Sequence, residues 1–266
     1  MLFLSQLLYS NSELTKFISA SHLTSQIGPD CTVLQQLSTC NDPQIILLYL
    51  LTQNQTIALN ISTDDLFKIN ETNDGETSAA FELSRSADDK PGAMILDTIL
   101  ALNRKIAEEI HINHLKKIYT NTEHKHSHRS VLFNLAIKSP KNLLNLIMQN
   151  ELAYKSNNTT HYLLNEFKLE DFLHVVRGIG TAFEHLCRTR NGRLILRRLI
   201  EKNPEFAKEI SLKLLCENQY GISPLLSLCK AAAKEDCTLL ECLMEMNPSI
   251  KNELTAKLLF DVDPNQ

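Results

Sequence analysis

The chain has 266 residues, of which 43% are apolar and 22% are charged, and its formal net charge is −4. This balance excludes a largely disordered chain, and we expect a folded protein with one large core or two small ones. No stretch approaches the roughly 20 apolar residues that span a bilayer, and the amino-terminal residues lack the pattern of a secretory signal, so we expect the protein to work in a cytosol.

Glycine and proline are scarce, at 7 and 8 residues, and alternating apolar and polar runs are rare, which favours helices over strands. Within this helical chain six asparagines share one apolar pattern. The residues seven, four and three positions before each of them are apolar in all 18 cases, and this spacing marks one buried face of a helix. Each asparagine should therefore end or restart a helix. The six are Asn11, Asn54, Asn103, Asn150, Asn203 and Asn247.

Apolar residues also follow each asparagine at three and twelve positions, which predicts a second amphipathic segment. Asparagine suits such a junction because its side chain can cap free N–H groups of the next helix and its backbone tolerates left-handed geometry. A third, short element precedes each full unit, and it opens with Ser or Thr, which cap helices, in four of five cases.

The asparagines are 43 to 53 residues apart, which is near the span of armadillo or HEAT units. The spacing predicts an all-α fold, a right-handed α-solenoid of about five three-segment helical repeats with an amino-terminal half repeat. The predicted single domain, 1–266, comprises a capping half repeat at 1–28 and units at 32–69, 78–119, 130–166, 180–217 and 222–261. Unit three should be the most irregular, because Asn142 and Asn157 interrupt its apolar pattern.

Two long connections, at 70–78 and 120–130, should be exposed loops. The second contains His124, His126 and His128, which could offer imidazole nitrogens to a transition metal. A flexible loop without a fourth ligand is a poor preformed site. We therefore predict neither a metal site nor a cofactor.

The seven cysteines are an odd number without a C-x-x-C pair, which argues against both disulfides and zinc. A catalytic interpretation would pair Cys187 with His185 or His174 and with Glu184. However, Cys187 occupies the same slot of its unit as Cys229 and Ala136, where a small apolar side chain packs between helices. We predict no catalytic residue and no enzyme, with a Cys/His site between repeats as an alternative.

A basic run at 188–202 places several cations away from the predicted buried face of its helix. We expect an exposed basic strip there, partly neutralised by Glu201, Glu205 and Glu209, that could contact an acidic protein surface, a phosphate or an anionic membrane. Residues 1–120 carry 14 acidic side chains against 8 basic ones, so nucleic acid is not a predicted partner. The strip residues, and candidate partner-binding residues, are Arg190, Arg193, Arg197, Arg198 and Lys202.

The segment "NQYGISPLLSLC" at 218–229 resembles the opening of an ankyrin repeat, with Gly221, Ser223, Pro224 and Leu225 in matching slots, and "LLECLMEMNP" resembles the second ankyrin helix. Over most of its length the chain resembles the divergent, ankyrin-like helical repeats of effectors that intracellular bacteria inject into host cells. The resemblance implies a protein-binding role, including control of another effector, and delivery into a host cytosol.

The predicted function is therefore a non-catalytic interaction module that binds, and inhibits or positions, a partner such as another effector or a host enzyme. We expect the protein by itself to be a monomer. Two alternatives stay open, an anionic lipid or phosphate binder that uses the basic strip at a membrane, and the Cys/His enzyme.

Overall fold

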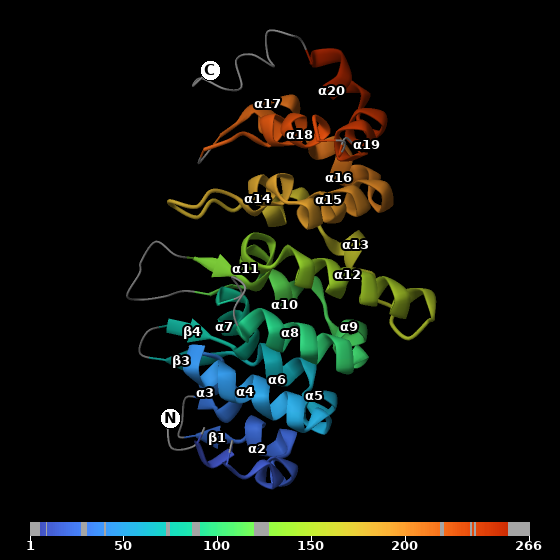
Figure 1. Cartoon of the computed structure of the whole chain (residues 1–266). Helices are drawn as coiled ribbons and strands as arrows, with labels where there is room; N and C mark the ends of the chain where they lie inside the picture. Colours follow the sequence, from blue (N-terminus) through green and yellow to red (C-terminus); the bar gives the residue numbers. More distant parts are fainter. Residues whose placement is uncertain are drawn as a thin grey trace. The chain divides into compact units, whose positions relative to one another are not determined.

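The structure is a computed structural model. It describes residues 6–8, 10–27, 31–39, 41–72, 75–86, 91–119, 128–218, 221–234, 236 and 238–254. Helices predominate, as predicted, and the chain divides into two compact units, Met1–His161 and Tyr162–Gln266, each described by itself below (Figure 1). Within the ranges just given, no helix combines the length and apolarity needed to cross a membrane.

The amino-terminal unit repeats one order of elements. Its elements are η1 (Ser12–Phe17), α2 (Ala20–Thr24), β1 (Gln26–Ile27), β2 (Cys31–Thr32), α3 (Val33–Ser38), α4 (Asn41–Gln53), α5 (Gln55–Asn60), α6 (Thr63–Phe67), β3 (Asn70–Thr72), β4 (Gly75–Thr77), α7 (Ala79–Arg85), α8 (Pro91–Leu102), α9 (Arg104–Glu109), α10 (Ile112–Lys116), β5 (Ile118–Tyr119), β6 (Arg129–Ser130), α11 (Val131–Lys138) and α12 (Pro140–Lys155).

The carboxy-terminal unit follows the same order. Its elements are α13 (Leu163–Glu166), η2 (Leu169–Phe172), α14 (Ala182–Arg188), α15 (Arg190–Lys202), α16 (Pro204–Glu209), α17 (Leu212–Cys216), α18 (Pro224–Ala232), α19 (Thr238–Met246) and α20 (Pro248–Glu253). The segment after each asparagine, predicted as one helix, is two short helices in three places: α5 and α6, α9 and α10, and α16 and α17.

Equivalent helices pack side by side within each unit. In the first unit α3, α7 and α11 pack in succession, as do α4, α8 and α12, and in the second α14 packs on α18 and α15 on α19. The apolar positions that repeat before the asparagines form these contacts; Leu47, Ile99 and Leu199, for example, are fully buried. Among the described members of this set Leu7, in the predicted capping segment, is 41% exposed, and Leu240 and Met244 are half-buried.

Hydroxyl side chains cap the short first helices, as predicted. Thr32, Ser130, Thr181 and Ser223 each accept a hydrogen bond from a backbone N–H two or three residues into the helix. The fifth first helix, α7, had no predicted cap. Ser78 caps it by accepting a hydrogen bond from the N–H of Phe81. Each cap satisfies a donor that the first helical turn leaves without a partner.

At most of the predicted positions the asparagine does separate two helices, but the hydrogen bonds of its side chain differ from the predicted capping bonds. The backbone of Asn54, Asn103 and Asn247 has φ of −133°, −110° and −132°, which is not left-handed, and their side chains cap no helix. Among the described junctions only Asn203 accepts a capping bond, from the N–H of Phe206 at 3.4 Å.

The side-chain amides of these asparagines instead donate to main-chain carbonyls about 40 residues earlier in the chain. Asn103 Nδ2 donates to the carbonyls of Ala58, Leu59 and Ile61 at 3.0, 3.2 and 2.7 Å. Those carbonyls are at the end of α5, where a helix leaves its acceptors without partners. We call the set of such bonds the asparagine ladder. Its other bonds are Asn54 to Thr15 and Ile18, Asn150 to Ala107, Asn203 to Phe167, and Asn247 to Ala207 and Ile210.

Asn150 corrects one prediction, because it neither ends nor restarts a helix. It lies inside α12, which continues to Lys155, although its amide still donates to the carbonyl of Ala107 at 2.9 Å. Two turns after it Asn157 has a φ of +58°, a left-handed conformation that asparagine tolerates. α12 itself runs unbroken from Pro140 to Lys155 through Asn142, so the irregularity that Asn142 was expected to cause does not occur in this helix.

Short antiparallel hairpins, which the sequence pattern did not predict, precede three of the first helices. β1 pairs with β2, β3 with β4 and β5 with β6. The segment expected to be an irregular loop at 70–78 is mostly the β3–β4 hairpin, where Gly75 has a φ of +119° that favours glycine. The tip of the second predicted loop, 120–127, lies outside the described residues, and with it His124 and His126.

Glycines mark the closest approach of the first helix to the second. A Cβ atom on Gly192 in α15 would lie 2.3 Å from the carbonyl oxygen of Leu186 in α14. Gly92 in α8 has the same position relative to its asparagine, and its Cβ would lie 2.6 Å from the carbonyl oxygen of Leu83 in α7. A side chain at either position would push the paired helices apart.

Candidate functional site

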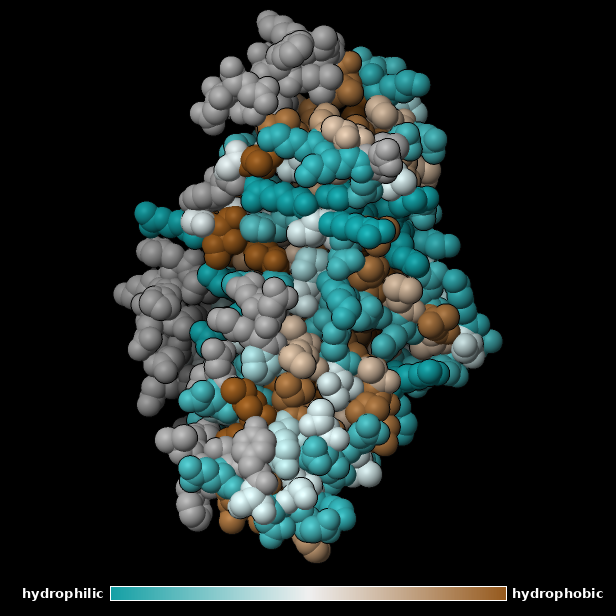
Figure 2. Space-filling view, in the orientation of Figure 1, coloured by the Kyte–Doolittle hydropathy of each residue, from teal (hydrophilic) through white to brown (hydrophobic). Residues whose placement is uncertain are grey.

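The predicted basic strip lies on α15. Thr189 caps this helix by accepting from the N–H of Gly192 at 3.1 Å, and a continuous apolar stripe anchors it to the core of its unit. The apolar stripe consists of Ile195, Leu196, Leu199 and Ile200. Hydrophilic residues cover most of the visible surface over α15 (Figure 2).

The strip residues differ in exposure. Arg190 and Lys202 are exposed, while Arg197 and Arg198 are half-buried. Arg197 Nε donates to Glu201 Oε1 at 2.6 Å, so Glu201 neutralises part of the strip, as predicted. This hydrogen bond raises the pKa of the Arg197 guanidinium. Leu194, one turn before Arg198, is 39% exposed and adds an apolar contact surface beside the charges.

Arg193 does not belong to an exposed strip, which corrects the prediction. Its side chain is only 12% exposed, and its Nε donates to Asp236 Oδ2 at 2.9 Å. Nη1 donates to the carbonyls of Cys187 and Arg188 at 3.3 and 3.1 Å. The spacing of the sequence placed Arg193 off the buried stripe, but Asp236 pairs with it in the fold.

The side chains of the predicted catalytic alternative have structural contacts. Cys187 is fully buried, and burial raises the pKa of its thiol, which disfavours the thiolate needed for nucleophilic attack. The ring of His185 hydrogen-bonds through Nε2 to the carbonyl of Ile179 at 2.9 Å, and Glu184 accepts from the N–H of Thr181 at 2.9 Å to complete a capping box. His174 is exposed. The burial of Cys187 agrees with its predicted role, which is packing between helices.

A second basic feature, which sequence reasoning missed, lies where α14 and α18 pack together. A pocket of about 320 Å³ is lined by four cationic side chains, with Ser227, Ile222 and Ala231. The cations are Arg188, Arg193, Lys230 and Lys234. The spacing of Lys230 and Lys234, four residues apart, indicated one helix side, but only the fold shows that this side faces Arg188. We call this feature the basic pocket.

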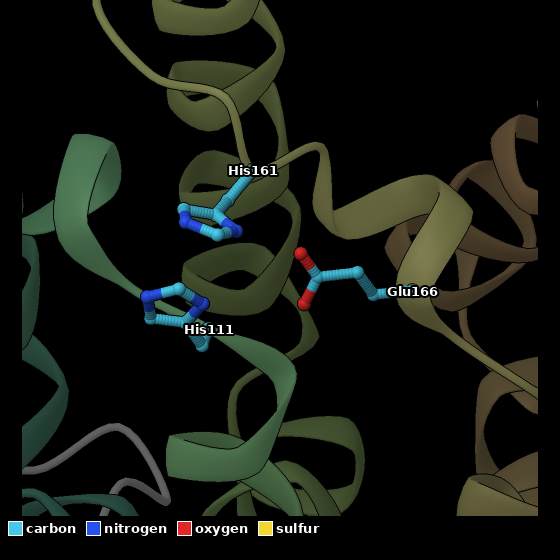
Figure 3. Close-up of side chains that lie close together, drawn as sticks. All are labelled: His111, His161 and Glu166. Atoms are coloured by element: carbon cyan, nitrogen blue, oxygen red, sulfur yellow. The ribbon is translucent and has the colours of Figure 1, made fainter.

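The amino-terminal unit contains a histidine pair that the sequence pattern did not single out. The rings of His111 and His161 have centroids 3.7 Å apart, and Figure 3 shows them beside one another. Asn150 fixes the chain here by donating to the carbonyl of His161 at 3.0 Å. Glu166, also drawn in Figure 3, is in α13 of the carboxy-terminal unit.

His114, one turn after His111, has a structural role. Its Nδ1 accepts a hydrogen bond from the N–H of His111 at 3.1 Å, and burial lowers its pKa. Two imidazoles, those of His111 and His161, supply half of the four ligands that a structural zinc site takes, and we assign no metal to them.

The chain matches no protein-family model, no curated protein and no solved structure. The ankyrin-like resemblance therefore remains a prediction that depends on the residues quoted for it. α15 and the basic pocket each bring several cationic side chains together.

Proposed function

We propose that the chain is a right-handed α-solenoid of about five repeats with an amino-terminal half repeat. Two features of the separate units support this arrangement. Equivalent helices pack in succession within each unit, and the asparagine ladder joins elements about 40 residues apart with the same chemistry in both. Repeat proteins are built from such nearest-neighbour contacts.

We further propose that the protein is a non-catalytic interaction module whose partner is another protein. One observation carries this proposal: the outward positions of equivalent helices differ in chemistry while their inward positions repeat. The residue nine positions before the asparagine is exposed in every described helix after the half repeat, and it is never the same residue in neighbouring helices. These residues are Ile45, Met94, Lys141, Leu194 and Thr238.

Such a framework separates stability from recognition. The buried positions keep the helices packed, whereas the outward positions are free to form a surface fitted to one partner. On α15 an exposed apolar side chain, Leu194, lies among arginines, and arginine with apolar neighbours is enriched at protein interfaces. We propose that α15 contacts an acidic surface of the partner through Arg190, Arg197, Arg198 and Lys202.

The partner class that we propose is another effector or a host enzyme, which the protein inhibits or positions. The place of action that we propose is a cytosol, including a host cytosol. The protein by itself is proposed to be a monomer, because one long repeat surface offers a partner its contacts without a second copy.

Affinity purification with charge-reversal variants tests the proposal. The variant Arg190→Glu/Arg197→Glu changes two outward residues of α15, and Lys208→Glu/Lys213→Glu makes the same charge change on exposed residues of α16 and α17. The wild type and the second variant should recover the same protein, and the first should recover at least about tenfold less.

Purified partner should then bind the wild type saturably with a fixed stoichiometry. If the wild type recovers no protein, or if both variants lose the partner equally, the proposed role of α15 is wrong. Binding to anionic vesicles that disappears at high salt, without any protein partner, would instead favour the lipid-binding alternative.

A further inference from the structure

We propose that the basic pocket between α14 and α18 is a binding site for a phosphate group, either free phosphate or a phosphate ester. This inference does not depend on the proposed protein partner. It concerns a different set of residues: the pocket is lined from α14 and α18 together with Arg193 of α15, and none of the residues proposed to contact the partner lines it.

The arginine wall of the pocket is fixed by the protein. Arg193 uses four of its five N–H donors on Asp236 and on the carbonyls of Cys187 and Arg188. Arg188 Nη2 donates to the carbonyl of Ile222 at 3.0 Å, which ties the end of α14 to the start of α18. An anion that enters the pocket therefore meets positive charge that is already ordered, so little conformational entropy is lost on binding.

The opposite wall supplies mobile cations. Lys230 is in the last turn of α18, and Lys234 follows one turn later on the same side. Both side chains are exposed, and neither forms an ion pair with any residue that the structure describes. Their ammonium groups offer donors that can close over a ligand held against the arginines.

Ser227 adds a neutral donor to the cations. It lines the pocket, and its hydroxyl has no hydrogen-bond partner among the described residues. The hydroxyl is therefore available to donate to an oxyanion that enters the pocket. The hydroxyl thus completes a set of donors that approach from α14, α15 and α18.

The charge balance favours a phosphate over a carboxylate. Four cations line the pocket, and Asp236 neutralises one of them through Arg193. A phosphate monoester carries about −1.5 to −2 charges at neutral pH and three acceptor oxygens, which match several separated donors better than a single carboxylate does. The volume of about 320 Å³ is ample for a phosphate and for part of the group that it esterifies.

Calorimetric titration with small anions tests the site. Inorganic phosphate and O-phosphoserine are titrated into the full chain at constant ionic strength, with acetate as the carboxylate probe, because screening would otherwise mimic a loss of binding. We expect saturable binding of at least one phosphate probe and at least about tenfold weaker binding of acetate. Binding of free phosphate alone identifies a free-anion site, and binding of both identifies an ester site.

The variant Lys230→Gln/Lys234→Gln removes two cations that make no described contact, so the fold should be unaffected. It should weaken phosphate binding at least about tenfold. The matched control, Lys208→Gln/Lys213→Gln, removes the same charge elsewhere in the unit and should bind as the wild type does. Ser227→Ala, which retains all four cations, should weaken binding several-fold.

Three outcomes would overturn the inference: no saturable binding of either phosphate probe, equal loss of binding in both lysine variants, or acetate binding as tight as phosphate binding. Loss of the protein partner in the α15 variants bears only on the proposed function, because Arg190 and Arg197 do not line the pocket.

Discussion

Replacement of Asn103 by alanine should destabilise the protein more than its small change in volume suggests. The side chain is 4% exposed, and its amide donates to three carbonyls, of which those of Ala58 and Ile61 are in buried bonds. Each buried acceptor that loses its partner costs about 1–3 kcal/mol. Two such acceptors give an expected loss of about 2–6 kcal/mol in the free energy of unfolding.

Urea denaturation followed by circular dichroism at neutral pH measures this loss, and hydrogen exchange locates it. Protection should fall first at the ends of α5 and α8, which Asn103 joins. Asn60→Ala is the matched control, because Asn60 is exposed and bonds only within its own helix, to the carbonyl of Thr56. It should change the free energy of unfolding by no more than about 0.5 kcal/mol.

Asn103→Asp separates hydrogen bonding from packing. Aspartate has the same shape but turns a carboxylate oxygen toward the carbonyls, so at neutral pH it should destabilise more than alanine does. Burial should raise the pKa of this carboxyl, so the folded state binds the extra proton and the deficit should shrink as the pH falls. If Asn103→Ala costs less than about 0.5 kcal/mol, or if Asn103→Asp is as stable as the wild type, the ladder does not stabilise the fold as we argue.

Three further predictions follow from single contacts. Gly192→Ala should lower the free energy of unfolding by about 1–3 kcal/mol, because the new methyl group would overlap the backbone of Leu186. The same change at an exposed helix position would stabilise the protein by up to about 1 kcal/mol. Thermal denaturation shows whether the variant is less or more stable than the wild type. Cys187 should resist iodoacetamide in the folded protein and react after denaturation, because burial raises the pKa of its thiol. Rapid labelling of Cys187 in the native protein, measured by mass spectrometry, would contradict its packing role. Because burial lowers the pKa of His114, the unfolded state binds more protons just below pH 6.5, and the free energy of unfolding should rise with pH through that window. The variant His114→Gln keeps an acceptor at this capping position and should flatten the slope of the free energy of unfolding against pH. An unchanged slope in pH-dependent denaturation would contradict this role of His114.

The helical framework could be predicted because its signal is local. Apolar positions at Leu47, Leu96 and Leu196 recur at helical spacing before an asparagine, and the same positions are buried in the structure. Hydroxyl caps such as Thr181 are equally local, since the residue and the N–H group that it accepts from are three positions apart.

The parts that could not be predicted depend on neighbours distant in the sequence. The asparagines were assigned a capping role because capping is the known local use of asparagine, but the carbonyls that Asn103 binds are about 40 residues away. Burial of Arg193 likewise depends on Asp236, which no helical spacing relates to it. The β3–β4 hairpin was missed although the sequence carries the turn signal Asp74-Gly75, because its strands are only three residues long.

The basic pocket shows the same limit at a candidate site. The sequence concentrates five arginines at 188–198, and the prediction grouped all of them except Arg188, together with Lys202, as one strip along a helix. In the fold Arg188 and Arg193 face Lys230 across the junction with α18, while Arg197 points away to Glu201. One run of basic residues therefore serves two different surfaces.

The asparagine ladder also gives the packed elements of each compact unit a polarity. Its bonds run from an asparagine amide back to a carbonyl about 40 residues nearer the amino terminus, so carbonyls near the end of one helix are satisfied by an asparagine that follows them in the chain. Shortening the chain from its carboxy-terminal side would strip acceptors such as the carbonyl of Ile210 of their donor, whereas shortening from the other side would leave an amide that water can hydrate. Truncation at the carboxy-terminal side should therefore cost more stability than truncation at the amino-terminal side.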